Sequence, residues 1–383
     1  MKLKVSTRGQ VPPFKVMDVM REANLLAANG RDILHLEVGQ PSTGAPAGVI
    51  AAAQKAMAID KLGYTDALGI NSLRRRIAQY YRDTHKIDLS EERVVVTTGS
   101  SGGFLLAFLS VFDAGDRVVL ADPSYPAYRN ILAALDIEAV GVLATAEDQY
   151  QPTPALLDNV DGNIDGLIIA SPANPTGTMI NAEEMASLTA YCIDRGIRLI
   201  SDEIYHGITY KTPGVTALSH TDHAFVINSF SKYYSMTGWR VGWMVIPENL
   251  NRLIERLAQN IFISVPALSQ HAATAAFDCV QELDENVARY AANRELLLRE
   301  LPNVGITKFS SSDGAFYVYA DVSHLTNNSE EFCRRLLNEV GVGIAPGSDF
   351  DRVRGISSIR ISFAGDTDTI SNAISRLTTW VSN

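Results

Sequence analysis

The feature of this sequence that most constrains its fold is the repeated alternation of short apolar runs with helical stretches between residues 94 and 245. Helical stretches such as 125–135 and 182–195 separate most of these runs. Short β-branched strands joined by helices are typical of a mostly parallel sheet that helices cover on both faces. The predicted strands of this sheet are residues 94–96, 118–120, 167–170, 198–201 and 225–228.

The chain changes its pattern after the fifth of these strands. A further strand, 239–245, follows too closely for a helical crossover, so we expect it to run antiparallel. A helical run from about 266 to 301 contains few helix breakers, and we place a domain boundary near residue 283, inside it. Beyond it, the pattern predicts a smaller α+β domain with a strand at 315–319, a helix at 329–340, a strand at 359–362 and a final helix.

Composition and charge exclude several classes of protein. The 383 residues carry 33 Lys and Arg against 43 Asp and Glu, and this net charge of −10 argues against nucleic-acid binding as the main role. The three cysteines form no CxxC pair and the histidines form no zinc pattern, so we expect no metal. The N-terminal segment lacks the apolar region of a secretory signal, and no apolar run is long enough to span a bilayer. We therefore expect a cytoplasmic protein.

Residues that can carry chemistry follow four of the predicted strands, where ligands of parallel sheets bind. Gly99–Gly103 suits a helix N-terminus that holds a phosphate. Ser171–Gly177 contains an Asn-Pro-Thr-Gly turn, and Asp202–Tyr205 contributes a carboxylate and a phenol. Ser229–Lys232 ends on a lysine that follows two serines. Together these segments predict a site for a phosphorylated ligand that has a basic ring nitrogen and an electrophile for the lysine.

Each of these segments also has a plainer interpretation. Gly99–Gly103 can be an ordinary strand-to-helix turn, Asp202 a helix N-cap, and Lys232 a solvated lysine. The first segment also fits the G-x-S-x-G pattern of serine hydrolases, in which Ser101 would be the nucleophile. No HGG-type oxyanion loop precedes it, and the partner histidine would come from scattered candidates: His206, His220, His223 and His271.

The order and spacing of five motifs are much more specific than any one of them. The chain resembles the class I and II aminotransferases, the fold-type I enzymes that use pyridoxal 5′-phosphate, and Arg240 lies eight residues after Lys232 as in that family. The motifs are SPANPTG at 171–177, SDEIY at 201–205, SFSK at 229–232, TGWRVGW at 237–243 and IRISFA at 359–364. The resemblance covers nearly the whole chain. It implies a large domain at 41–282 and a small domain made of both chain ends, 1–40 and 283–383.

The resemblance assigns a role around the cofactor to each matching residue. It implies that Lys232 forms an imine with the cofactor aldehyde and then carries the proton during transamination. Asp202 would pair with the ring nitrogen, Tyr205 and Asn174 would hydrogen-bond the phenolic oxygen of the ring, and Tyr125 would stack on it. Lys232, Asp202 and Tyr205 are thus the predicted catalytic residues. The predicted ligands of the cofactor phosphate are Ser100, Ser101, Gly102, Ser229, Ser231 and Arg240.

The resemblance also implies how substrate and subunits are arranged. Arg360 would bind the substrate α-carboxylate with its planar guanidinium, beside Asn174 and the backbone of Gly39. Tyr64 matches a family tyrosine that reaches the phosphate of the neighbouring subunit, which implies a homodimer with shared active sites. The helix after the phosphate segment has no Lys or Arg before Arg117, so a carboxylate side chain of a substrate would lose its hydration there without a partner. We therefore expect a ping-pong exchange between a neutral L-amino acid and a 2-oxo acid.

Two other functions stay open at this point. A β-elimination lyase of the same fold would use the same Lys232, Asp202 and Arg360, so the motifs do not separate it from a transaminase. A regulator that senses the cofactor would need an attached DNA-binding module. Because the resemblance starts near Arg8 and the chain is acidic, we do not expect such a module.

Overall fold

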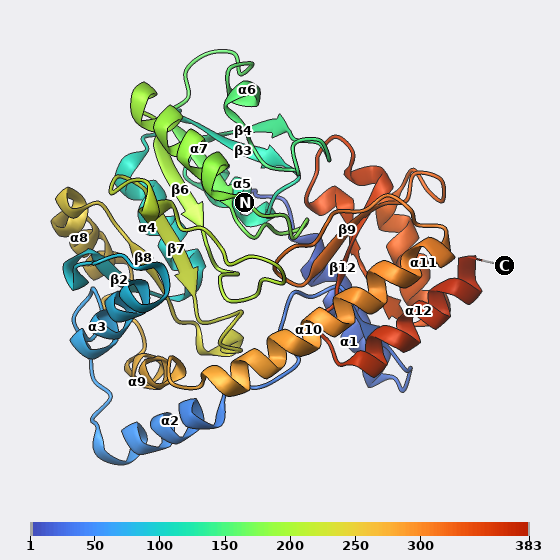
Figure 1. Ribbon diagram of the computed structural model, residues 1–383, viewed down its shortest axis with the longest axis horizontal. Coiled ribbons are helices and arrows are strands. Elements are labelled where there is room, and N and C mark those ends of the chain that lie inside the picture. The colour runs from blue at the N-terminus through green and yellow to red at the C-terminus, as the bar shows by residue number, and fades with distance from the viewer. Residues whose placement is uncertain (1–2, 382–383) are drawn as a thin grey trace.

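A seven-stranded sheet organises the larger part of the computed structural model, which describes residues 3–381 (Figure 1). Its strand order is β2-β8-β7-β6-β5-β3-β4, and only β8 runs antiparallel to its neighbours. The predicted parallel strands and the antiparallel one are therefore confirmed. The strands are β2 (Val94–Thr97), β3 (Arg117–Asp122), β4 (Glu138–Leu143), β5 (Gly166–Ala170), β6 (Arg198–Asp202), β7 (Phe225–Ser229) and β8 (Gly242–Val245).

Helices cover both faces of this sheet because its strands are apolar on both sides (Figure 1). Within β2, Val94 and Val96 face one core and Val95 faces the other, as the alternation of side chains along a strand requires. The first core includes α2 (Ala47–Ile59), α3 (Asn71–Tyr80), α6 (Pro154–Leu157), α7 (Ala182–Arg195) and α9 (Ala267–Ala276). The second includes α4 (Gly99–Val111), α5 (Pro126–Ala134) and α8 (Asn251–Ile261).

The two ends of the chain meet in a smaller α+β unit. Here β1 (Leu34–His35) pairs in parallel with β10 (Val342–Gly343), beside an antiparallel sheet in the order β11-β12-β9. The strands of that sheet are β9 (Tyr317–Asp321), β11 (Ala345–Pro346) and β12 (Ser358–Ser362). The helices of this unit are α1 (Lys15–Ala28), α10 (Val280–Glu300), α11 (Ser329–Val340) and α12 (Thr367–Val381). Helix α10 extends from α9 to this unit (Figure 1).

The structure differs from the predicted elements in several places, and the strand expected at 315–319 begins only at Tyr317. The helical run at 266–301 is two helices, α9 and α10, because the chain turns at Phe277 and buries its ring against Phe230, Tyr234 and Trp243. Strand β4 was not predicted, since this edge strand is only partly buried and lacks a fully apolar run. Strand β8 begins later than expected, after a 3-10 turn at Thr237–Trp239. The domain boundaries stay a prediction; residue 283 lies in the first turn of α10, and residues 1, 2, 382 and 383 lie outside the described chain.

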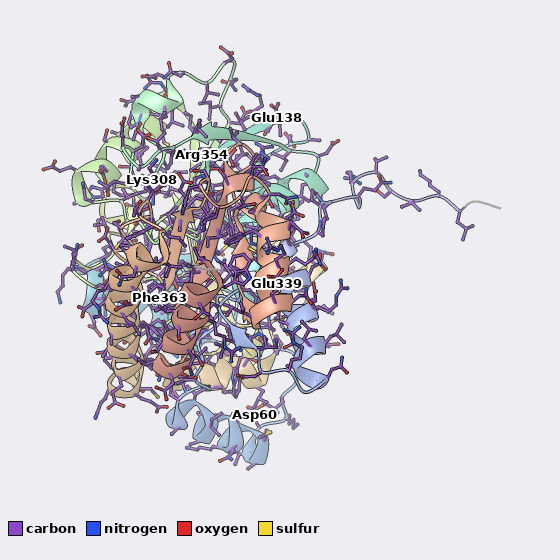
Figure 2. The ribbon with its side chains drawn as sticks, turned by 90° about the vertical axis from the view of Figure 1, so that its right-hand side faces the viewer. Asp60, Glu138, Lys308, Glu339, Arg354 and Phe363 are labelled. Atoms are coloured by element: carbon purple, nitrogen blue, oxygen red, sulfur yellow. The ribbon has the colours of Figure 1, made fainter. Side chains whose placement is uncertain are left out.

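The N-terminal segment leaves the body of the molecule before α1. Residues 3–13 are all exposed, and Figure 2 shows the segment extending away from the helices. Leu3 and Val5 are 81% and 72% exposed, so this segment presents apolar side chains without a partner in its own subunit. None of the helices in residues 3–381 has the length and apolarity that a bilayer crossing requires.

Candidate active site

The carboxyl ends of β5 and β6, the loop after β7 and the first turn of α4 open into one cavity. Residues of β9, β12 and the segment after β1 line it from the smaller unit, and it encloses about 920 Å³ of empty space, counting the part open to solvent. Most of the predicted site residues line this cavity. They are Gly39, Ser100, Ser101, Tyr125, Asn174, Asp202, Tyr205, Ser231, Lys232, Arg240 and Arg360.

Lys232 reaches the cavity from the loop that follows β7. Its Nζ donates a hydrogen bond of 2.6 Å to the backbone oxygen of Gly39 and lies 5.8 Å from the centre of the Tyr205 ring. Burial, followed by the positive charges of Arg360 and Arg240, lowers the pKa of Lys232 from 10.5 to about 8, against the opposing charge of Asp202. About a tenth of this amine is therefore uncharged at pH 7, far more than for an ordinary lysine, and is able to attack a carbonyl group.

Asp202 is the last residue of β6, and its carboxylate is buried. The Tyr128 hydroxyl donates a hydrogen bond to Oδ2, and the Ile204 N–H donates one of 3.1 Å to Oδ1. Burial raises the pKa of Asp202 to about 6, although both hydrogen bonds and the charge of Lys232 act in the opposite direction. At pH 7 most of this carboxylate is ionised, and it can pair with a protonated ring nitrogen.

The first turn of α4 and the loops around it form a cradle for an anion. Ser100 and Ser101 lie in this turn and line the cavity, and the preceding Thr98 makes no side-chain cap. The first N–H groups of a helix have no partner within the helix, so they are available to an anion here. Glycine is favoured at residue 99 because its φ of +66° is a conformation that residues with a Cβ rarely adopt, and Nη2 of Arg240 lies directly beside it. Arg240 thus brings its positive charge directly to the start of the helix.

Arg360 and Asn174 line the cavity together. Arg360 lies on β12 and is only 2% exposed; its Nη1 donates 2.9 Å to Oδ1 of Asn174, and its Nη2 donates to the backbone oxygen of Glu37. Its Nε is buried and has no hydrogen-bond partner among residues 3–381. Because a buried guanidinium needs its donors satisfied, this arrangement fits a carboxylate ligand.

Three of the predicted site residues do not line the cavity. Gly102 is buried within the first turn of α4, and the Ser229 hydroxyl lies behind Ser231, with the two Oγ atoms 3.0 Å apart. Tyr64 lies in the loop between α2 and α3 and is 84% exposed.

Sequence reasoning missed two tyrosines of the cavity, Tyr128 and Tyr317. Tyr128 lies one helical turn after Tyr125 on α5 and contacts the end of β6, 74 residues later. The hydroxyl of Tyr317, on β9, lies 2.7 Å from that of Tyr205. Both contacts depend on how the elements pack in space. The sequence carried one indication: Tyr128 lies three residues after Tyr125, so on a helix the two side chains share a face. Apolar residues of the N-terminal side were also missed: Phe14, Val16, Met17 and Val38.

The structure offers no hydrolase site around Ser101. None of the seven histidines, all of which lie in the described chain, lines the cavity that contains this serine. His206 instead packs against His85, with ring centres 5.5 Å apart, and lines a different cavity. No group of His, Cys, Asp and Glu within residues 3–381 could hold a metal ion.

The arrangement fits pyridoxal 5′-phosphate. Its phosphate suits the unpaired N–H groups and Arg240, its ring nitrogen suits the buried carboxylate of Asp202, and its aldehyde suits the amine of Lys232. Arg360, whose Nε has no partner among residues 3–381, lines the same cavity, where it can receive the carboxylate of an amino acid.

Comparison with known proteins agrees with this geometry. The family described as "Aminotransferase class I and II" matches residues 31–377. The chain is 50% identical to a valine–pyruvate aminotransferase of Mycobacterium tuberculosis, over 99% of this chain and 98% of that protein. It is 32% identical to a (5-formylfuran-3-yl)methyl phosphate transaminase of Methanocaldococcus jannaschii, over 95% of each chain.

Solved structures show the same likeness in space. A crystal structure of an aminotransferase from Mycobacterium tuberculosis superposes with a TM-score of 0.97 at 49% identity, over 100% of both chains. The aspartate aminotransferase of Thermus thermophilus with maleate superposes with a TM-score of 0.93 at 27% identity, over 99% of this chain and 100% of that one.

Proposed function

The chain belongs to the class I and II aminotransferases and is a pyridoxal-phosphate-dependent enzyme that transfers amino groups, and from this premise we propose its substrates, its residue roles and its assembly. The proposed donor is an L-amino acid with a neutral side chain, and the acceptor is a 2-oxo acid that reacts in the same cavity. The observation that carries this proposal is the meeting of Lys232, Asp202 and Arg360 around a cavity that is otherwise mostly uncharged. The similarity to a valine–pyruvate aminotransferase supports the same class of donor.

The cavity offers one cation for the α-carboxylate of the substrate and no further cation for a carboxylate on its side chain. Lys232, Arg240 and Arg360 are the cations that line it within residues 3–381. We assign Lys232 to the cofactor aldehyde, Arg240 to the phosphate and Arg360 to the α-carboxylate. The remaining space near Arg360 is bounded by apolar residues of α1 and of the segments on either side of it. These residues include Phe14, Val16, Met17 and Val38.

The proposed roles divide the chemistry among few groups. When bound, pyridoxal 5′-phosphate supplies an aldehyde that condenses with amines and a protonated ring that accepts the electron pair left when the amino acid loses its Cα proton. Asp202 holds the ring nitrogen protonated because its ionised carboxylate favours the positive charge. Lys232, once released from the aldehyde, accepts the Cα proton on Nζ and donates it back to the cofactor side of the same bond.

Other residues bind and orient the cofactor and the substrate. Tyr205 and Asn174 donate hydrogen bonds to the phenolic oxygen of the cofactor ring, and Tyr125 packs against the face of that ring. Arg360 binds the α-carboxylate in the position that Gly39 also borders. The phosphate is bound by Arg240 and by Ser100, Ser101 and Ser231, which line the cavity. Ser229 acts behind them through its hydrogen bond to Ser231, and Gly102 through its place in the same turn of α4.

We also propose a homodimer in the cytoplasm. Tyr64 supplies its hydroxyl to the phosphate of the neighbouring subunit, and exposed apolar side chains around its loop, Met57, Ile59 and Ile263, support a contact there. The three cysteines are free thiols, which suits a reducing compartment. Sedimentation of the cofactor-loaded protein tests the dimer, and fractionation of cells tests the location.

The experiment that tests the reaction uses the cofactor-loaded protein and single amino acids. Each amino acid is added without an acceptor, and the conversion of the cofactor to its amine form is followed by absorbance while the 2-oxo acid is identified. Stoichiometric conversion by a neutral amino acid supports the proposal. Continuous release of pyruvate and ammonia, without an acceptor, would instead reveal a β-elimination lyase.

A further inference from the structure

Tyr317 contacts three parts of the candidate site at once. Its hydroxyl lies 2.7 Å from that of Tyr205, and the guanidinium carbon of Arg360 lies 4.4 Å from the centre of its ring. A Cβ on residue 39 would lie 1.6 Å from the Tyr317 hydroxyl, so only glycine lets the chain pass here. Tyr317 is 1% exposed and is held in a β-strand, which fixes its ring in this position.

The direction of the hydrogen bond between the two tyrosines follows from counting hydrogens. A phenol has a single O–H, and Tyr205 can use it either for Tyr317 or for the cofactor. The hydroxyl of Tyr317 has no other hydrogen-bond partner in the described chain than that of Tyr205. If Tyr205 donates to the phenolic oxygen of the cofactor, the hydrogen between the tyrosines must come from Tyr317.

We propose that Tyr317 is a positioning residue that makes Tyr205 the hydrogen-bond donor to the cofactor and holds Arg360 flat for the substrate carboxylate. Its hydroxyl acts on the cofactor side through Tyr205, because a phenol that accepts a hydrogen bond becomes a stronger donor. Its ring acts on the substrate side through the stacked guanidinium. This inference rests on the proposed function, in which Tyr205 and Arg360 contact cofactor and substrate.

Tyr317→Phe separates the two contributions, since it removes the hydroxyl and keeps the ring. The measurement is the pH dependence of the absorbance of bound cofactor. A hydrogen bond donated to the ring oxygen withdraws negative charge from it, so the nearby proton on Lys232 Nζ is held less tightly. We expect the midpoint of this absorbance change to rise by about 0.3 to 1 pH unit in Tyr317→Phe. Tyr205→Phe should raise it further.

The double variant shows whether Tyr317 acts through Tyr205. Once Tyr205 lacks its hydroxyl, removing that of Tyr317 should shift the midpoint no further, so the two effects are not additive. Additive shifts would overturn the proposed route. Tyr319→Phe is the matched control: it lies on the same strand, is buried, and does not line the cavity. An unchanged midpoint in Tyr317→Phe, as expected for Tyr319→Phe, would overturn the proposal.

The role proposed for the Tyr317 ring is tested by steady-state kinetics. Tyr317→Leu should raise the KM for the amino acid about tenfold or more, whereas Tyr317→Phe should leave KM within about twofold. Equal KM values in both variants would contradict the role of the ring. If Tyr317→Leu does not fold, the titration of Tyr317→Phe still decides the role of the hydroxyl. A wild-type enzyme that transfers no amino group would contradict the proposed function itself, and is thereby distinguished from a failure of Tyr317.

Discussion

The Nζ of Lys232 donates a hydrogen bond of 2.6 Å to the backbone oxygen of Gly39, 193 residues earlier in the chain. Lys232 follows a strand of the seven-stranded sheet, whereas Gly39 follows β1, which pairs with β10 near the C-terminal end. Arg360 is fixed against the same segment, since its Nη2 donates to the backbone oxygen of Glu37. Lys232 and Arg360, which we propose to bind cofactor and substrate, therefore both donate hydrogen bonds to the backbone of residues 37–39. The site forms only when the two ends of the chain are folded together.

The first prediction concerns the point where the cofactor is attached. Borohydride reduction of the loaded enzyme, followed by peptide mapping, should place the label on Lys232. Lys232→Ala should bind the cofactor without a covalent bond and should lose nearly all amino transfer, because no other amine lines the cavity within residues 3–381. Lys211→Ala, which changes an exposed lysine, is the control and should label normally. Label on another lysine would refute the assignment.

The second prediction is the pH dependence of this attachment. Only the uncharged amine attacks the aldehyde, so the rate at which the cofactor-free enzyme takes up the cofactor covalently should rise with pH, with a midpoint near 8. Arg360→Gln removes a positive charge that lowers the pKa of Lys232, so the midpoint should move to higher pH. Stopped-flow absorbance measures both rates. A midpoint near the ordinary value for lysine in the wild type would show that the amine is not perturbed.

The third prediction concerns Asp202. Asp202→Asn keeps the size of the side chain but cannot stabilise a positive charge on the ring nitrogen, so turnover should fall by about 10²–10⁴-fold while cofactor affinity changes much less. Steady-state kinetics and equilibrium binding of the cofactor give the two numbers. Asp202→Glu retains a carboxylate and should recover part of the rate. Near-normal turnover of Asp202→Asn would mean that the carboxylate only caps the backbone N–H of Ile204.

Most of this site was predictable because parallel sheets gather their strand ends at one edge. Asp202, Lys232 and Asn174 each follow a strand that the apolar pattern identified, so their meeting followed from the topology. The role proposed for Arg360 came from the family resemblance, because the local pattern around it indicates only a buried strand. Its partner Asn174 lies 186 residues away, a contact that no local period encodes.

The contacts and the helix break that the sequence did not predict depend on packing between distant elements. Tyr205 and Tyr317 are 112 residues apart, and both fall in segments whose buried aromatic residues are also typical of a core. The break between α9 and α10 has no proline or glycine, and it arises because Phe277 fits an aromatic cluster contributed by several segments. Such a turn is determined by the space that the rest of the fold leaves, so the uninterrupted helical pattern of 266–301 did not show it.

The fourth prediction tests whether Tyr64 completes the site of a neighbouring subunit. Tyr64→Ala should weaken cofactor binding about tenfold or more although this tyrosine is 84% exposed in its own subunit. Mixing inactive Lys232→Ala subunits with Tyr64→Ala subunits should restore activity at limiting cofactor. In a hybrid dimer, one site has its own Lys232 and receives Tyr64 from the other subunit. No recovery, after exchange of subunits has been verified, would show that the sites are not shared.

The last prediction concerns the side chain of the donor. The cavity wall formed by Phe14, Val16, Met17 and Val38 is uncharged, and α4 brings no Lys or Arg to it. A carboxylate placed there would lose hydration without gaining a partner, at a cost of several kcal/mol. Single-turnover rates should therefore be higher for alanine, valine, leucine or phenylalanine than for aspartate. Faster conversion by aspartate would show that a cation from elsewhere reaches the substrate.

A single substitution at this wall can test the cause of that preference. Met17 lines the cavity and is 46% exposed, so an arginine there can keep its charge in contact with solvent. Met17→Arg should raise the rate with aspartate relative to that with alanine by about tenfold, because the new guanidinium can pair with the side-chain carboxylate. Met17→Gln, which is polar but uncharged, should leave the ratio nearly unchanged. If both variants change the ratio equally, the missing charge does not determine which donor is used, and the shape of the cavity must do so.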